Sequence, residues 1–88
     1  MKIRYEFVAR SIAGEHFLVP IGEAARQFSG MFALNELGAF LWEAIPGAVD
    51  EAELVDRVLD EYEVDQATAR QDVSEFLDNL RAMGILEP

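Results

Sequence analysis

The segment from Leu34 to Ile45 constrains the fold most strongly, because its apolar residues fit a helix that is buried on most sides. At 100° per residue the apolar side chains fill an arc of about 200°, whereas a helix on a surface needs roughly 100°. The segment therefore predicts a central helix in contact with two other elements. Gly38 lowers helix propensity by about 1 kcal/mol relative to Ala, so we expect another element to approach the backbone closely there. We expect Asn35 or a neighbour to cap the start of this helix, and Pro46-Gly47 predicts its end.

Two further helices are predicted after the central one. Asp50, with Glu53 three residues later, is typical of a helix start, and the apolar residues that follow recur at helical spacing. Asp65 is a second capping residue, for a helix that runs to about Met83 and stops at Gly84. We expect the following Ile85 and Leu86 to pack back onto that helix.

The residues before the central helix favour strands. Tyr5 to Ile12 and His16 to Pro20 are rich in aromatic and β-branched residues, and the turn between them predicts an antiparallel pair. Residues 24–33 are predicted to form a third, irregular strand with a break at Ser29-Gly30. Three strands followed by three helices define an α+β fold, with residues 1–88 as a single domain and at least one unpaired sheet edge.

Composition favours a binding module over an enzyme. A chain of 88 residues has one small core with little room for a buried catalytic cavity. The absence of Cys excludes a disulfide framework, and His16 is the single imidazole, so we expect no metal and no cofactor. The acidic residues lie on predicted helix faces and do not form a calcium-binding loop. No catalytic constellation is present.

Charge is distributed unevenly along the chain, with a net value of −10. Residues 34–88 contain three basic and fourteen acidic side chains. This half would repel phosphate, so we expect no nucleic-acid binding. The sequence has neither the apolar segment of a signal peptide nor a membrane span, and we therefore expect a cytoplasmic protein that does not bind membranes.

The last predicted helix has two different flanks beside its apolar stripe. Arg70, Ser74 and Arg81 lie on one flank, next to Val73 and Leu77, and Asp72 and Asn79 lie on the other. One interpretation is the wall of a groove, with an apolar surface and basic side chains along its edge, suited to a peptide with aliphatic and acidic side chains. The alternative is that the arginines extend beside the core and pair with acids such as Glu75 or Asp78.

The apolar residues Phe28, Met31 and Phe32 also allow two interpretations. They lie near a predicted sheet edge, where they could form a docking surface, but packing in the core explains them equally well.

Four short motifs resemble the PqqD-like family. They are Val19-Pro20-x-Gly22-Glu23, Phe32-x-Leu34-Asn35-Glu36-x-Gly38-x-Phe40-Leu41-Trp42, Glu61-Tyr62-x-Val64-Asp65 and Asp72-Val73-x-x-Phe76-Leu77-x-x-Leu80-x-x-x-Gly84. Together they cover nearly the whole chain. The Leu-Asn-Glu helix start and the Tyr-x-Val-Asp motif are fairly specific when they occur together in so short a chain.

This resemblance implies a winged-helix-like domain, known as a recognition element for ribosomally synthesised and post-translationally modified peptides (RiPPs). Such a domain binds the leader of a precursor peptide as an added strand, between the third strand and the third helix. It presents the precursor to a modifying enzyme, often a radical S-adenosylmethionine enzyme. The candidate peptide-binding residues are then Arg26, Phe28, Met31, Phe32, Arg70, Val73, Ser74, Leu77 and Arg81.

The chain departs from the namesake branch in the segment 24–31. This segment is several residues longer than the short connection expected there. Pyrroloquinoline quinone biosynthesis is one possible pathway, and the longer segment favours a branch that serves another modified peptide.

Two other functions share the predicted topology. A winged-helix DNA-binding regulator would need a basic recognition helix, whereas both later helices are dominated by acids. A structural dimerisation domain would pair two third strands across a two-fold axis, giving a homodimer through the sheet edge.

Overall fold

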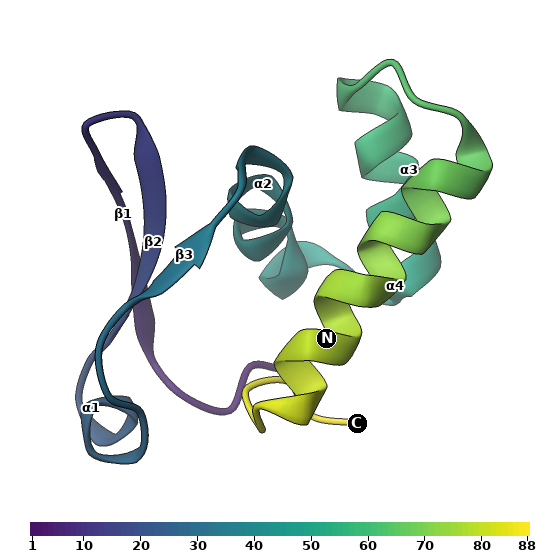
Figure 1. The fold of residues 1–88 in the computed structure, drawn as a ribbon. Helices are drawn as coiled ribbons and strands as arrows, with labels where there is room; N and C mark the ends of the chain where they lie inside the picture. The colour runs from purple at the N-terminus through teal and green to yellow at the C-terminus, as the bar shows by residue number, and fades with distance from the viewer.

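The sheet has three antiparallel strands and precedes most of the helices (Figure 1) in the computed structural model, which describes residues 1–88. Strands β1 (Phe7–Ile12) and β2 (Glu15–Pro20) pair with Val8 opposite Val19. Ala13 and Gly14 both have positive φ angles, as a tight hairpin turn with the right-handed strand twist requires. Strand β3 (Phe32–Leu34) pairs with β2, so β1 and β3 are the two sheet edges. The predicted α+β fold is confirmed.

Residues 24–33 do not form the long irregular strand that the sequence predicted. Helix α1 (Glu23–Gln27) follows Gly22, and β3 is only three residues long. Ala, Arg, Gln and Glu are good helix formers, and a side-chain hydrogen bond of 3.4 Å joins Gln27 to Glu23 one turn away. The prediction gave too much weight to the aromatic residues that follow this short helix.

The central helix is α2 (Glu36–Ala44), followed by the 3₁₀ turn η1 (Ile45–Gly47). Figure 1 shows α2 between the sheet and the last two helices, as its wide apolar arc predicted. Leu34 belongs to β3, and Asn35 is the N-cap of α2, as the sequence predicted. The Asn35 side chain accepts a 2.7 Å hydrogen bond from the Gly38 backbone N–H.

The predicted close approach at Gly38 is confirmed. A Cβ atom at this position would lie 3.2 Å from the Phe76 ring and 3.1 Å from the Asn35 side-chain oxygen. Glycine therefore lets the last helix pack directly against the α2 backbone.

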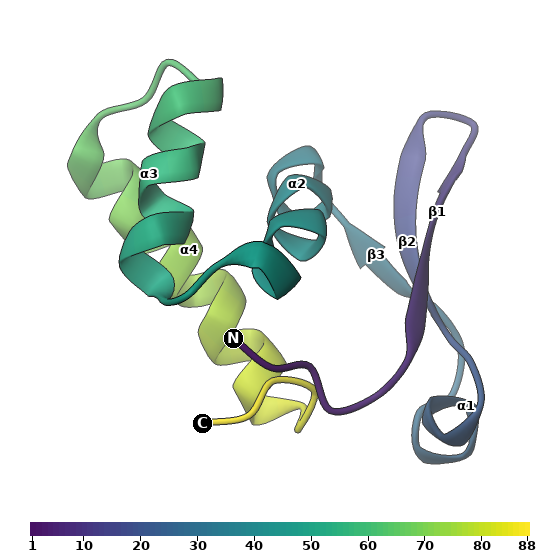
Figure 2. The same cartoon turned by 180° about the vertical axis from the view of Figure 1, so that it is seen from behind.

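The last two helices are α3 (Glu51–Glu61) and α4 (Gln66–Ala82), which lie against each other in both views (Figure 2). Both predicted caps are present: Asp50 accepts a hydrogen bond from the Glu53 N–H, and Asp65 accepts one from the Thr68 N–H. The main hydrophobic cluster contains residues of α2, η1, α3, α4 and the C-terminal segment.

The two ends of the chain meet beside the end of α4 (Figure 1). Gly84 has a φ of 77° and reverses the chain, so that Ile85 and Leu86 return to the core, both buried as predicted. Ile3 pairs with Leu86 in an isolated bridge, and the Arg4 N–H donates to the Ile85 carbonyl at 2.7 Å. None of the helices combines the length and the apolar character needed to span a bilayer.

Candidate functional site

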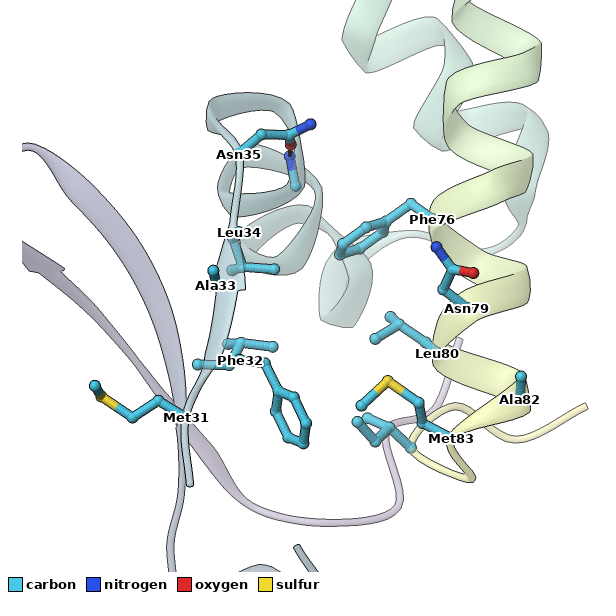
Figure 3. A pocket seen from close by; sticks show the side chains of 13 residues that line it. Met31, Phe32, Ala33, Leu34, Asn35, Phe76, Asn79, Leu80, Ala82 and Met83 are labelled. Atoms are coloured by element: carbon cyan, nitrogen blue, oxygen red, sulfur yellow. Dashed lines mark hydrogen bonds between the residues drawn. The ribbon is translucent and has the colours of Figure 1, made fainter. Parts of the chain in front are cut away.

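A cleft of about 570 Å³ lies between β3 and α4 (Figure 3), and 10 of its 13 lining residues are hydrophobic. The unpaired outer edge of β3 forms one side of it, because β2 is the only strand that pairs with β3. The backbone amide and carbonyl groups on such an edge have no partner within the sheet. Free hydrogen-bonding groups and an apolar surface thus occur side by side.

The β3 wall of the cleft follows the alternation of a strand. Phe32 and Leu34 are half-buried and point toward α2 and α4, whereas Ala33 between them is exposed and points to the opposite face (Figure 3). Met31, just before the strand, is 53% exposed and borders the cleft, with its side chain directed away from α4 in Figure 3.

The opposite wall is one face of α4 together with Met83, which follows the helix. Phe76, Leu80 and Met83 point toward the strand in Figure 3, and Asn79 also lines the cleft. Leu80 is buried, whereas Met83 is 38% exposed. The buried side chains of Leu18, on β2, and Ile85 also line the cleft. The site is therefore assembled from residues far apart in the sequence.

An aromatic cluster supports the β3 wall from behind. The ring of Phe32 lies 5.8 Å from Phe28 and 6.2 Å from Phe7, and Phe28 in turn lies 5.3 Å from Tyr5. Edge-to-face and tilted contacts at these separations are favourable and restrict the rings. The cluster fixes the position of Phe32, and Phe28 itself does not line the cleft.

Two acidic side chains lie beside one end of the cleft. None of its 13 lining residues is charged. A smaller pocket of about 230 Å³ shares Asn35, Gly38, Phe76 and Asn79 with it and adds the carboxylates of Asp72 and Glu75. No salt bridge or side-chain hydrogen bond involves either carboxylate.

Met31 and Phe32 are the two candidate residues from the sequence that line the cleft. Phe28 lies behind it in the aromatic cluster. Arg26 lies on α1, where its exposed guanidinium is 4.0 Å from the Glu23 carboxylate and does not line the cleft.

The α4 residues proposed from the sequence do not line the cleft. Val73 and Leu77 are fully buried in the helical core, so a peptide in the cleft could not contact them directly. Arg70, Ser74 and Arg81 lie beyond that core stripe, on the flank opposite Asn79. The Arg81 guanidinium is 3.2 Å from Asp78, as the alternative interpretation of an arginine paired beside the core expected.

Five residues on α4 or directly after it line the cleft but were not predicted to do so: Phe76, Asn79, Leu80, Ala82 and Met83. A helical wheel separates the two flanks of α4 but does not show which flank faces the sheet. Gly38 offered a partial signal, because a glycine there indicated that another element packs closely against α2; in the structure that contact is made by Phe76 of α4.

Ionisable groups do not converge elsewhere in the molecule in a way that suggests metal binding. No three His, Asp or Glu side chains lie close enough together to hold a metal ion.

Comparison with known proteins identifies the family of the chain. A family model described as coenzyme PQQ synthesis protein D (PqqD) matches residues 15–86. Among solved structures, the chain is similar to TbiB1 in complex with the TbiA(beta) leader peptide, at 29% sequence identity and a TM-score of 0.74. That similarity covers 99% of this chain and 95% of the TbiB1 chain. No curated protein sequence matches. The chain belongs to the PqqD family and is a PqqD-like RiPP recognition element.

Proposed function

We propose that this protein captures the leader of a ribosomally synthesised precursor peptide in the cleft between β3 and α4. The observation that carries this proposal is the unpaired edge of β3 beside an apolar cleft. A related chain, TbiB1, has been solved with a leader peptide, which supports the same class of ligand here.

Strand addition would use both features of the site. A guest strand would lie about 4.8 Å from β3 and would satisfy the amide and carbonyl groups of its outer edge. Alternate side chains of the guest would enter the cleft and contact Phe32, Leu80 and Met83. Main-chain hydrogen bonds would provide affinity for any extended peptide, and the apolar cleft would select among peptides.

The proposed partner of the captured peptide is a modifying enzyme of the radical S-adenosylmethionine type. The PqqD family description, which names a role in coenzyme synthesis, supports a place in a peptide-modification pathway. In this proposal the protein contributes binding and presentation, and the partner enzyme contributes the chemistry. Co-purification of the tagged protein with an enzyme encoded beside it, dependent on the precursor peptide or strengthened by it, is the expected result.

Amide NMR tests the placement of the peptide. Synthetic leaders from the precursor peptides encoded beside this gene are titrated into the ¹⁵N-labelled protein, with a scrambled leader as control. We expect the largest shifts at Phe32–Leu34 and at residues 76–83. Shifts confined to β1 or α3, or none with any leader, would contradict the proposal.

The same unpaired edge supports a second candidate, a homodimer in which two β3 strands pair across a two-fold axis. Light scattering with and without leader separates the two. A dimer that dissociates when leader is added would use the edge for both purposes, and a dimer unaffected by leader would place self-association elsewhere.

A further inference from the structure

The end of the cleft next to α2 differs from the rest of it in charge. The part beside Phe32 and Met83 is apolar, whereas the carboxylates of Asp72 and Glu75 line the smaller pocket that continues it past Phe76. Asp72 is half-buried and Glu75 is exposed.

No cation of the protein forms a salt bridge or a side-chain hydrogen bond with either carboxylate. Three arginines lie in the helical half: Arg57 pairs with Glu53, Arg81 pairs with Asp78, and Arg70 lies on the opposite flank of α4. The net charge of −10 adds a negative potential over the whole molecule. An acidic side chain that entered here would meet like charge and lose hydration, which is unfavourable, whereas a basic one would meet charge of opposite sign.

We propose that the peptide segment that occupies the cleft carries a Lys or Arg side chain that pairs with Asp72 and Glu75, beside apolar side chains that fill the cleft along β3. This inference rests on the function proposed above and names the chemistry of the peptide that the site selects. It reverses the sequence-based expectation of an acidic peptide, because the arginines behind that expectation do not line the cleft.

The shape of the site suits a long basic side chain. Phe76 lines both the apolar cleft and the acidic pocket, so the aliphatic part of Lys or Arg can lie along its ring while the charged group reaches the carboxylates. Side chains two residues apart on a strand point to the same face. The basic residue and the apolar residues should therefore lie on the same face of the guest strand, at every second position.

Selection from a random library tests this inference even while the natural ligand is unidentified. A phage-displayed library of 12-residue peptides is selected on the folded protein. We expect enriched peptides with apolar residues at alternate positions and Lys or Arg at one end of the apolar pattern. Apolar peptides without a preferred base would overturn this inference and leave the proposed function standing. Failure to enrich any peptide would count against both.

Matched variants then locate the acidic contact. Asp72→Asn/Glu75→Gln should weaken the selected Lys-containing peptide about fivefold, the size expected for two partly exposed ion pairs. Asp56→Asn/Asp60→Asn removes the same charge from the exposed face of α3 and should leave that affinity unchanged at physiological salt. Equal losses in the two double variants would show a non-specific charge effect and overturn the inference.

A charge swap provides an independent check. Asp72→Lys should lose affinity for the Lys-containing peptide and gain affinity for the same peptide with Glu in its place. If this variant does not fold, the wild-type protein with the Lys, Gln and Glu forms of the peptide gives the decisive comparison. Affinity in the order Lys, Gln, Glu supports the inference, and equal affinities contradict it.

Discussion

At the scale of single residues, Gly38 has the clearest structural consequence, because a side chain there would displace Phe76 and the Asn35 cap. We predict that Gly38→Val lowers the free energy of unfolding by about 1–3 kcal/mol through overpacking. Ala52→Val, on the exposed side of α3, is the control and should cost only about 0.5 kcal/mol of helix propensity. Urea unfolding of both variants measures the difference. A Gly38→Val protein as stable as the control would show that Phe76 can move aside freely.

A second residue, Asp65, links stability to acid pH. Its carboxylate accepts a hydrogen bond from the Thr68 backbone N–H at 2.7 Å, and this bond lowers the pKa of Asp65 below its ordinary value of 3.8. Because the folded pKa is lower than the unfolded one, the stabilisation is present above about pH 3.8 and is lost as the pH falls through the folded pKa.

Asn at this position separates the cap from its charge. We predict that Asp65→Asn keeps the cap, because Asn is also a good N-cap residue, but removes this part of the acid dependence. Asp65→Ala should lower stability at neutral pH as well. Unfolding free energies measured from pH 2 to 6 test both, and an unchanged acid dependence in Asp65→Asn would contradict the assignment.

Features set by neighbouring residues could be predicted from the sequence. The caps at Asn35, Asp50 and Asp65 each act on a residue three positions later, so a short sequence window contains both partners. The close approach at Gly38 could also be predicted, because a glycine inside an apolar helix face weakens the helix unless its small size is needed for packing. The identity of the partner, Phe76, depends on how α4 is rotated, and a helix taken alone does not define that rotation.

At the scale of elements, α4 presents different surfaces to the core, the cleft and solvent. We predict that Met83→Ala weakens a bound apolar peptide about tenfold, because the partly exposed Met83 side chain gives part of the apolar wall. Arg70→Ala, on the opposite flank, is the control and should leave affinity unchanged. Calorimetry with a selected peptide measures both. An effect of Arg70→Ala that exceeds that of Met83→Ala would move the binding surface to the other flank.

Helix α1 shows why the connection between β2 and β3 was predicted incorrectly. A five-residue helix provides little periodicity, and the neighbouring Phe28, Met31 and Phe32 favour a strand by composition. The helix is held by tertiary contacts that the sequence does not reveal: Ala24 is completely buried, and Phe28 packs into the aromatic cluster. Where such contacts determine the structure, local propensity is a weak guide.

At the scale of the whole molecule, the sheet edge and the helical half provide different parts of one site. Topology could be predicted, because three strands before a central helix leave β3 at an edge. The chemistry of the cleft could not, since it depends on which flank of α4 faces that edge. The arginine flank faces away, and the cleft is therefore apolar with one acidic end.

This charge distribution predicts how association depends on salt. The molecule measures 38 × 32 × 19 Å, so at 0.01 M ionic strength, where the screening length is about 30 Å, charges over most of its surface act on an approaching peptide. At 0.1 M the screening length is about 10 Å and mainly nearby charges such as Asp72 and Glu75 act. The association rate constant of a Lys-containing peptide should therefore fall steeply between these conditions.

The dissociation rate should change much less, because the apolar contacts of the bound peptide are not screened. Stopped-flow fluorescence of Trp42, which packs against Phe7 in the aromatic cluster behind the cleft, or of a dye-labelled peptide, measures both rates. The Glu form of the peptide should show the opposite trend, with association that becomes faster as salt screens the repulsion. If both peptides respond to salt in the same direction, charge does not guide the peptide to the cleft, and affinity arises from strand addition and apolar contact alone.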